Sequence, residues 1–363
     1  MIPAPTTVNT NKQENTMKKF WISLFLSLSL LISGCQTVVL PEQPTFLPVS
    51  GEGLSVHYID VGQADCALLE CGGAYMLIDG GNVDDSDLVV TYLQQQGVQE
   101  LQTVICTHAH EDHVGGLPAV LAVYPTQQVY SPTKTYSSRC FDDFMYYVDQ
   151  QGLTITDPVP GDTFSLGEAQ VTVLGPVKSY ADTNNTSIVV KVVYGDTSFL
   201  FTGDMEKDAE TDLLESGADV RADVLKVGHH GSDTSTGYRF LYEVDPDYAV
   251  ISVGTGNSYG HPHKEPLERL TQAGVTQLRT DQLGTIVAFS DGTQITFHWD
   301  NQNADPQQVE KADTETCYIG NKNSKVVHTP SCGNLPAEQN RVTFDTLDDA
   351  LSQGYRACSN CMG

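Results

Sequence analysis

The chain is poor in basic residues. It has 19 lysines and arginines against 46 aspartates and glutamates, which gives a formal net charge of −27 over 363 residues. Proteins that bind nucleic acids normally present a basic surface, so this composition excludes broad electrostatic contact with a polyanion. Such a partner would need bound cations and a local basic patch at the cleft. Candidates for that patch, each of which alone is typical of a solvated surface charge, are Lys226, Arg239, Lys264, Arg269 and Arg279.

The sequence also has no internal repeat and no low-complexity tract. A chain of this length suits one large domain and one small domain. We place the large domain at residues 53–300, a polar linker at 301–314 and a small module at 315–363.

An apolar stretch near the N-terminus is short for a stop-transfer span but fits a secretory signal. Met17-Lys18-Lys19 supplies a basic start, and Ile32-Ser33-Gly34-Cys35 closes the stretch with small residues. We therefore expect a signal peptide over residues 1–34. Met17 is the expected true start, because the residues before it are polar. The alternative is an uncleaved membrane anchor.

The segment Ile32-Ser33-Gly34-Cys35 resembles a bacterial lipobox. The resemblance implies a diacylglyceryl group on Cys35, which would attach the mature chain to a membrane. Residues 35–52 contain three prolines and are expected to form an extended, lipidated tether. The chain is thus predicted to be an extracytoplasmic, membrane-anchored bacterial lipoprotein.

A cluster of possible metal ligands follows an apolar run. Residues 108–113 hold three histidines and two acidic residues, and imidazole and carboxylate are common ligands of Zn²⁺ and similar ions. In extended backbone His108 and His110 would point to one side and reach one ion. A bend at Gly115-Gly116 would aim Asp112 and His113 at a second ion. A His-rich surface loop is the alternative, but the spacing favours a two-metal site.

Three further apolar segments end in residues of the same type. They are 198–202 followed by Asp204, 224–227 followed by His229 and His230, and 248–253 followed through a Gly-rich loop by His261. A lone histidine is more often structural than a ligand. Four strand-like segments that all end this way indicate metal coordination.

With these residues in place, the chain resembles the metallo-β-lactamase superfamily and, within it, the soluble hydrolase domain of ComEC-type DNA-uptake proteins. The resemblance implies an α/β (α+β) fold, a four-layer αββα sandwich with metals at one edge of its two sheets. It rests on segments in family order: 57–65, 77–81, 108–113, 185–189, 202–204, 225–232 and 259–262.

The resemblance also implies a ligand set for two divalent ions, either Zn²⁺ or Mn²⁺. His108, His110 and one of His229 and His230 would hold the first ion, Asp112, His113 and His261 the second, and Asp204 would bridge them. Better-known members carry a ligand histidine before the bridging aspartate, where this chain reads Asp182-Thr183-Asn184-Asn185. The pair His229-His230 is expected to take over that role, and the sequence leaves open which of the two binds.

Two such cations would lower the pKa of water and neutralise a phosphoryl oxygen. No Ser-His or Cys-His nucleophile is needed, so we expect water to attack, with Asp112 orienting it and with His113 and Asp204 as the other catalytic residues. Further candidates for substrate contact or ligand support are Asp60, Gln63, Asp65, Asp79, Asn185 and Ser232. For Asp60 and Asp79 a loop-capping role is an equal alternative.

The C-terminal module carries a second set of ligands. His328 and Cys332, then Cys358 and Cys361, have the spacing of a closed four-ligand zinc site. About 50 residues bury little core, so one structural Zn²⁺ would stabilise the fold. The module resembles the metal-binding domain of Ada, but His328 replaces the methyl-accepting cysteine, so methyl transfer is not implied. A disulfide-bonded tail is the alternative.

These features favour a surface-anchored metal-dependent hydrolase, a phosphodiesterase or nuclease that acts on DNA, with a monomer as the favoured state. A phosphorylcholine-esterase-like enzyme or another hydrolase of the same fold is the second hypothesis. The third is a lipoprotein that binds DNA without cleaving it. The complete ligand set argues against the third, because a pure binder has no need of an open two-metal site.

Overall fold

A computed structural model of the chain describes residues 52–304, 318–329, 332, 334–344 and 347–362. The predicted signal peptide, Cys35 and almost all of the tether and linker lie outside the described residues. Within the described residues, no helix combines the length and the apolar character that a membrane span needs.

The large domain contains two extended sheets. The first has eight strands, in the order β15 (Ile295–Trp299), β14 (Ile286–Ser290), β1 (Leu54–Tyr58), β2 (Ala67–Cys71), β3 (Ala74–Ile78), β4 (Leu101–Ile105), β5 (Thr126–Tyr130) and β6 (Ile155–Thr156). The second has seven, in the order β13 (Thr276–Arg279), β12 (Tyr248–Ile251), β11 (Val224–Lys226), β10 (Thr197–Phe201), β9 (Val189–Tyr194), β8 (Ala169–Gly175) and β7 (Thr163–Leu166).

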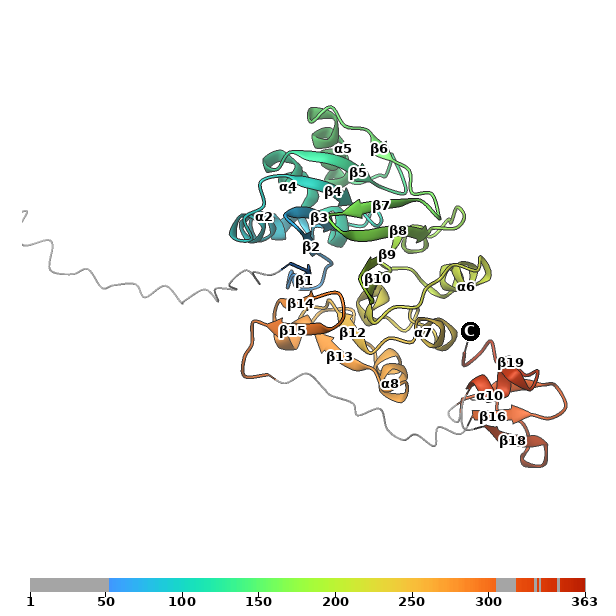
Figure 1. Cartoon of the computed structure of the whole chain (residues 1–363). Coiled ribbons are helices and arrows are strands. Elements are labelled where there is room, and N and C mark those ends of the chain that lie inside the picture. The colour runs from blue at the N-terminus through green and yellow to red at the C-terminus, as the bar shows by residue number, and fades with distance from the viewer. Residues whose placement is uncertain (1–51, 305–317, 330–331, 333, 345–346, 363) are drawn as a thin grey trace, which may run out of the picture. The chain divides into compact units, whose positions relative to one another are not determined.

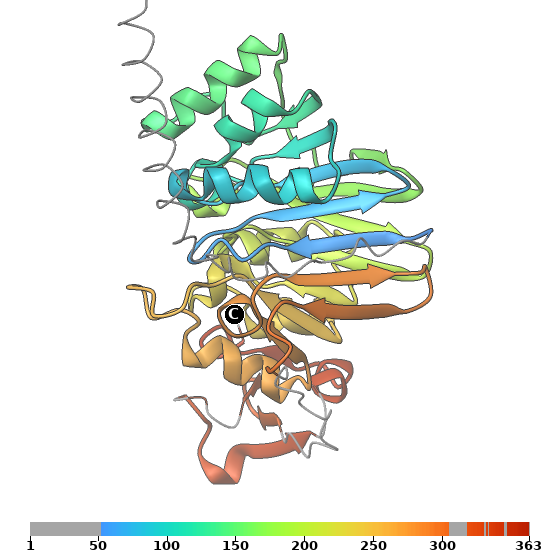
Figure 2. The ribbon, with the colours of Figure 1, turned by 90° about the vertical axis from the view of Figure 1, so that its left-hand side faces the viewer.

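Strand β1 joins the beginning and the end of the large domain. It pairs antiparallel with β14 on one side and with β2 on the other, and Figure 2 shows the orange strands beside the blue ones. All five residues of β1 are buried, as expected for a central strand covered on both faces.

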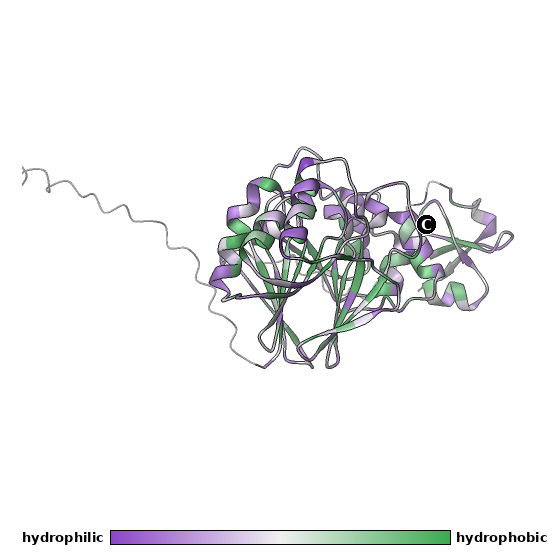
Figure 3. Cartoon of the chain, turned by 90° about the horizontal axis from the view of Figure 1, so that it is seen from above, coloured by the Kyte–Doolittle hydropathy of each residue, from purple (hydrophilic) through white to green (hydrophobic). Residues whose placement is uncertain are grey.

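The two sheets pack face to face around the main core. Leu54, Val56 and Met76 of the first sheet and Val190, Phe199 and Phe201 of the second contribute to it. Helices α2 (Ser86–Gln95), α4 (Leu117–Val123) and α5 (Arg139–Gln150) cover the outer face of the first sheet, and α6 (Lys207–Glu215), α7 (Tyr238–Val244) and α8 (Lys264–Gln272) that of the second (Figure 1). The strands are mostly hydrophobic and the helices carry the hydrophilic surface (Figure 3). The predicted four-layer αββα sandwich is confirmed.

Parallel strands direct their carboxyl ends to one edge of each sheet. Strands β10, β11, β12 and β13 run parallel, and so do β3, β4, β5 and β6. Loops that follow such strands meet at that edge. Short helices lie in these and neighbouring loops: η1 (Val83–Asp85), α3 (Glu111–Val114), η2 (Asn184–Thr186), η3 (Gly228–Gly231) and α9 (Thr280–Leu283).

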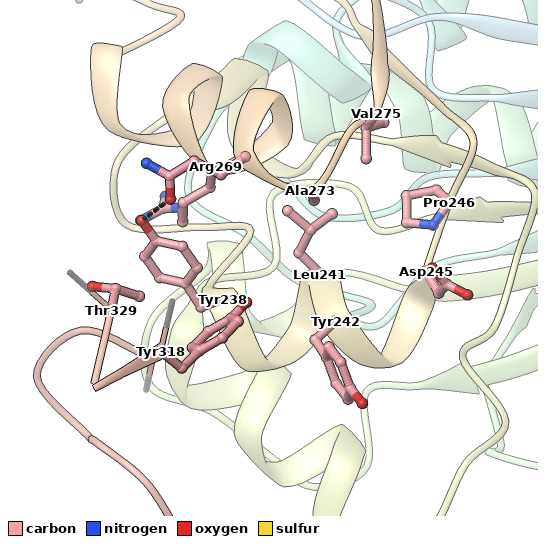
Figure 4. Close-up of a pocket in the computed structure, with 11 residues that line it drawn as sticks. Tyr238, Leu241, Tyr242, Asp245, Pro246, Arg269, Ala273, Val275, Tyr318 and Thr329 are labelled. Carbon is pink, nitrogen blue, oxygen red and sulfur yellow. Dashed lines mark hydrogen bonds between the residues drawn. The ribbon is translucent and has the colours of Figure 1, made fainter. Parts of the chain in front are cut away.

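Helices α7 and α8 support one of these loops from outside. Arg269 of α8 lies over the ring of Tyr238, whose hydroxyl donates to Gln272 Oε1 (Figure 4). The buried Arg269 also donates from Nη2 to the carbonyl of Ser235 at 3.0 Å. Glu210 of α6 accepts the amide of Gly237 at 2.9 Å. The segment after η3 is therefore held by buried polar contacts.

The C-terminal module is built on a four-stranded sheet. Its strands lie in the order β18 (Arg341–Phe344), β16 (Tyr318–Asn321), β17 (Val326–His328) and β19 (Arg356–Ala357), accompanied by η4 (Glu338–Asn340) and α10 (Leu347–Ser352). Its small core contains Val327, Phe344, Leu347, Ala350 and Tyr355. So small a core supports the expectation that a bound metal stabilises the module.

Candidate metal centre

The loop after β4 brings two histidines together. Nε2 of His108 lies 3.0 Å from Nδ1 of His110. We expected extended backbone here, but residues 108–110 form a bend, and His110 caps the N-terminus of α3. Asp112 and His113 lie on that short helix, so the bend and the first helical turn orient the four side chains.

Asp204 follows β10 and is 2 % exposed. The preceding Gly203 has a φ of +51°, and a Cβ there would lie 2.9 Å from Ser187 Oγ. Only glycine fits this left-handed, crowded position. Ser187 Oγ accepts the amide of Asp204 at 3.0 Å, which fixes the start of its side chain.

The two carboxylate oxygens of Asp204 face different histidines. Oδ1 lies 3.2 Å from His113 Nε2 and 3.7 Å from His230 Nε2. Oδ2 lies 3.9 Å from His108 Nε2 and 3.6 Å from His229 Nε2. Asp204 is thus in the position predicted for a bridging ligand.

Both histidines of the pair after β11 turn toward Asp204. His229 and His230 have φ values of +49° and +52°, which non-glycine residues rarely adopt. Such backbone costs about 1–3 kcal/mol per residue and is typically found at functional sites. It places the two rings on opposite oxygens of Asp204, so the structure gives each of the two histidines a place in the cluster.

Hydrogen bonds at Nδ1 leave Nε2 of two histidines free to bind a cation. His113 Nδ1 donates to Asp79 Oδ2 at 2.8 Å, and His230 Nδ1 donates to the carbonyl of Ser252 at 3.0 Å. These contacts fix the tautomer in which Nε2 carries a lone pair. Among the described residues, the Nε2 atoms of both rings and Oδ1 of Asp204 are buried without a hydrogen-bond partner.

These unpartnered atoms fit a divalent ion. The ligand atoms of Asp112, His113, Asp204 and His230 all lie within 4.8 Å of one another. Buried polar atoms without partners are rare in proteins, so their convergence on one point calls for a bound group. Nitrogen and oxygen donors in this number suit Zn²⁺ or Mn²⁺.

The carboxylates create a field that favours positive charge. Burial alone would lower the pKa of His230, but the charges of Asp204 and Asp65 outweigh it and raise that pKa to about 10. Burial likewise opposes ionisation of Asp204, yet the neighbouring His113 and His230 hold its pKa well below the usual range. A site that stabilises protonated imidazoles so strongly also attracts metal cations.

A buried ion pair lies behind His230. Lys226 Nζ is 2.9 Å from Asp65 Oδ2, and the two side chains are 5 % and 8 % exposed. Asp65 Oδ1 is in turn 3.4 Å from His230 Nδ1. From the sequence we expected Asp65 to contact substrate or support a ligand, and Lys226 to be a solvated surface charge. Lys226 instead neutralises the carboxylate that faces a ligand histidine.

The structure does not bring His261 into the four-residue group. Its Nδ1 lies 3.4 Å from Gln63 Nε2, and its ring stacks 6.4 Å from that of His230. Burial, together with the charges of His229 and His230, lowers the pKa of His261 to about 4. His230, rather than His261, lies with Asp112, His113 and Asp204 in this group.

The other predicted residues support loops or ligands. Asp79 does both, because it accepts the amide and hydroxyl of Thr107 at 2.8 and 2.7 Å as well as His113. Asp60 caps its own loop by accepting the amide of Gly62. Asn185 accepts the amide of Glu206. Ser232 Oγ lies 2.9 Å from the hydroxyl of Thr234.

Sequence reasoning missed three residues beside His229. Glu206 Oε1 lies 3.3 Å from its Nδ1, Thr234 Oγ1 lies 3.2 Å from the same atom, and Asn184 Nδ2 lies 3.5 Å from its Nε2. Asn184 was noted only as part of a segment without histidine. No spacing links these positions in the sequence, because three separate loops supply them.

The cluster opens into a cavity. Its lining consists of Gln63, His110, Asp112, Asn184, Asp204, His229, His230, Tyr259 and His261. None of these nine residues is a serine, cysteine, lysine or arginine. None of the five cations suggested for a basic patch lines this cavity. Lys226 and Arg269 are buried, Arg279 pairs with Asp281, and Lys264 pairs with Glu268.

The module holds its own cluster. Ligand atoms of His328, Cys332, Cys358 and Cys361 lie within 4.8 Å of one another, with His328 Nδ1 3.3 Å from Cys332 Sγ. These three cysteines of the described part of the module are free thiols. Burial opposes ionisation of Cys358, but the amides of Asn360 and Cys361 lower its pKa. A thiolate is what a metal ligand requires.

The sandwich and the histidine–aspartate cluster at its strand edge define a metallo-hydrolase. Residues 59–255 match the family model of the metallo-beta-lactamase superfamily, and residues 306–362 match that of the metal binding domain of Ada. The chain belongs to the metallo-beta-lactamase superfamily and carries an Ada-type metal-binding domain at its C-terminal end.

The curated relatives of the chain include a protein named for competence. The chain is 32 % identical over 257 residues to ComE operon protein 3 of Bacillus subtilis, covering 66 % of this chain and 33 % of the relative. It is 30 % identical over 246 residues to competence protein ComA of Neisseria gonorrhoeae, covering 67 % and 33 %. It therefore spans about a third of the length of these relatives. Among solved structures, the metallo-beta-lactamase fold protein YhfI of Bacillus subtilis matches with a TM-score of 0.46 and 13 % identity, covering 66 % of this chain and all of that one.

Proposed function

We propose that this protein is a metal-dependent phosphodiesterase that cleaves DNA by attack of water at the histidine–aspartate cluster. The observation that carries the proposal is the convergence of buried, unpartnered Nε2 atoms of His113 and His230 on Oδ1 of Asp204. The relatives support DNA as the substrate, because the name of the Neisseria gonorrhoeae relative refers to competence and that of a further relative in Haemophilus influenzae, 31 % identical over 244 residues, refers to recombination.

Two divalent ions, Zn²⁺ or Mn²⁺, fit the two sides of Asp204. His108, His110 and His229 would hold the first, and Asp112, His113 and His230 the second, which assigns both members of the histidine pair. When bound, the ions lower the pKa of water and neutralise charge on a phosphoryl oxygen.

The residues of the cavity perform the remaining tasks. Asp112 is 29 % exposed, whereas Asp204 is buried, so the Asp112 carboxylate can orient an attacking water and accept its proton. No serine or cysteine lines the cavity, which supports water as the nucleophile. The amide of Asn184 faces the same space and can donate to a phosphoryl oxygen.

The test is cleavage by the chain from residue 36 onward of linear single-stranded, linear double-stranded and circular DNA, with added Mn²⁺ or Zn²⁺. We expect metal-dependent cleavage that the double variant Asp112→Ala/His113→Ala lacks, and cleavage of the circle would reveal endonuclease action. Retained binding without cleavage would show that loss of activity is not loss of substrate contact. If only a phosphorylcholine ester, a β-lactam or bis-p-nitrophenyl phosphate were hydrolysed, the DNA assignment would be wrong.

We also propose that the protein works outside the cytoplasm, attached to a membrane through a lipid on Cys35. The support is the lipobox-like sequence before Cys35, which lies outside the described residues. Replacement Cys35→Ser should move the chain from the membrane fraction to the soluble fraction, as followed by immunoblot. A variant that stays membrane-bound would favour an uncleaved anchor instead.

We further propose that the C-terminal module binds one structural Zn²⁺ through His328, Cys332, Cys358 and Cys361. The set has the composition of a closed site, with three sulfurs and one nitrogen. Because no position is left for water or substrate, the ion would serve folding.

A further inference from the structure

One aromatic side chain at the rim of the cavity is unusually exposed. Tyr259 is 67 % exposed, the largest value among the exposed large hydrophobic residues in the described part of the chain. It lies in the loop after β12 and lines the same cavity as Asp112, Asp204 and His230. The simplest explanation for an exposed aromatic ring beside the proposed hydrolytic site is that the ring binds a ligand.

The ring of Tyr259 is the outermost of three rings that lie nearly parallel to one another. It stacks on His261 with centroids 5.7 Å apart and an interplanar angle of 23°. His261 stacks in turn on His230, at 6.4 Å and 24°. The three rings extend from His230, a proposed metal ligand, to the surface. Since His261 covers one face of Tyr259 and most of the residue is exposed, the other face is open to a planar group.

Hydrogen bonds hold the backbone of the loop that carries this ring. Asn257 accepts the amides of Tyr259 and His261, both at 3.1 Å, and its Nδ2 donates to the carbonyls of Gly254 and His261. Gly254 donates to Gln63 Oε1 at 3.2 Å, which ties the loop to the β1–β2 turn. An aromatic residue with a fixed backbone loses little conformational entropy when a ligand stacks on its ring.

Charge cannot supply the affinity for a polyanionic strand. The chain has a net charge of −27, and the nine residues that line the cavity include neither lysine nor arginine. Bound ions can take one phosphate, but the neighbouring nucleotides need another kind of contact. Stacking of a base on an aromatic ring is such a contact, tolerates any base, and changes affinity by about 5- to 150-fold per base.

We propose that Tyr259, supported by His261, is the platform on which a nucleobase next to the scissile phosphate stacks. The proposal rests on the proposed function and adds a substrate class. A base within a duplex is already stacked and paired, so the preferred substrate is single-stranded nucleic acid or an unpaired strand end.

The experiment compares three substrates of equal length: a single-stranded oligothymidylate, the same strand with abasic residues, and a duplex. In the Mn²⁺-loaded protein, Tyr259→Ala should raise KM for the thymidylate strand at least about fivefold while changing KM for the abasic strand less than about twofold. Tyr259→Trp should restore KM, because indole also stacks. The matched control is Tyr146→Ala, which removes another exposed tyrosine (56 %) from α5.

The outcomes separate this inference from the proposed function. If wild-type protein cleaves DNA but Tyr259→Ala changes both single strands equally, or lowers kcat alone, the platform is refuted and the nuclease stands. A wild-type preference for duplex would refute it as well. If no DNA is cleaved, the proposed function fails. Hydrolysis of a phosphorylcholine ester with a Tyr259-dependent KM would then assign the ring to a quaternary ammonium group.

Discussion

Replacing Asp204 by asparagine should empty both ion sites of the large domain and lower hydrolysis at least about 10³-fold. Asparagine keeps the volume but removes the charge that faces His113 and His230 on one side and His108 and His229 on the other. Each proposed ion would lose its shared ligand. The remaining histidines would then repel a cation to the extent that they are protonated.

Metal content gives the clearest measurement. Elemental analysis of the wild-type protein should find about three divalent ions per chain, two in the large domain and one in the module. Asp204→Asn should retain about one, and Cys358→Ser about two. The control Asp291→Asn makes the same change in the exposed β14–β15 turn, where Asp291 accepts only local backbone and side-chain donors, and should keep all three. An Asp204→Asn variant with full occupancy would show that this carboxylate does not bridge.

The placement of the cluster could be predicted because strand ends are visible in the sequence. The apolar runs before His108, Asp204 and His229 became β4, β10 and β11, within two residues at each end. Parallel strands necessarily bring their carboxyl ends to one edge, so ligand-type residues placed there had to meet. The sandwich follows from the same alternation of buried strands and amphipathic helices.

The contacts that His229 and His230 make could not be predicted. These contacts depend on left-handed backbone at both His229 and His230. A histidine in the sequence does not by itself indicate a positive φ. That conformation turns His230 toward Asp112, with 3.3 Å between Nε2 and Oδ2. His261 lies outside the group of Asp112, His113, Asp204 and His230. The sequence motif indicates which residues lie close together. The backbone angles of the turn at His229 and His230 determine which atoms these two side chains contact.

The burial of Lys226 also could not be predicted from the sequence. In a three-residue strand between loops, a lysine is typical of an exposed position, and nothing local indicates burial. The structure buries it because Asp65, 161 positions earlier, lies opposite in the β1–β2 turn. Long-range pairing of this kind leaves no trace in either segment alone.

Replacing Lys226 by methionine should destabilise the large domain by about 3–5 kcal/mol. Methionine fills similar space but leaves the Asp65 carboxylate buried without its cation, and Lys226 also donates to the carbonyl of Val227 at 2.9 Å. For a domain of this size the melting temperature should fall by about 6–20 °C. Thermal unfolding with and without chelator, followed by circular dichroism, measures the effect.

The expected loss of stability comes from the unpaired charge of Asp65 rather than from poorer packing, and a double variant separates these two causes. Adding Asp65→Asn to Lys226→Met removes the unpaired carboxylate and should recover part of the lost stability, whereas a packing defect would persist. Asp65→Asn alone should weaken the ion held by His230 about 10- to 100-fold, because Asp65 faces Nδ1 of that ligand. As a control, Lys134→Met breaks the exposed pair with Asp157 and should cost less than about 1 kcal/mol. Equal losses at Lys134 and Lys226 would contradict the buried pair as a source of stability.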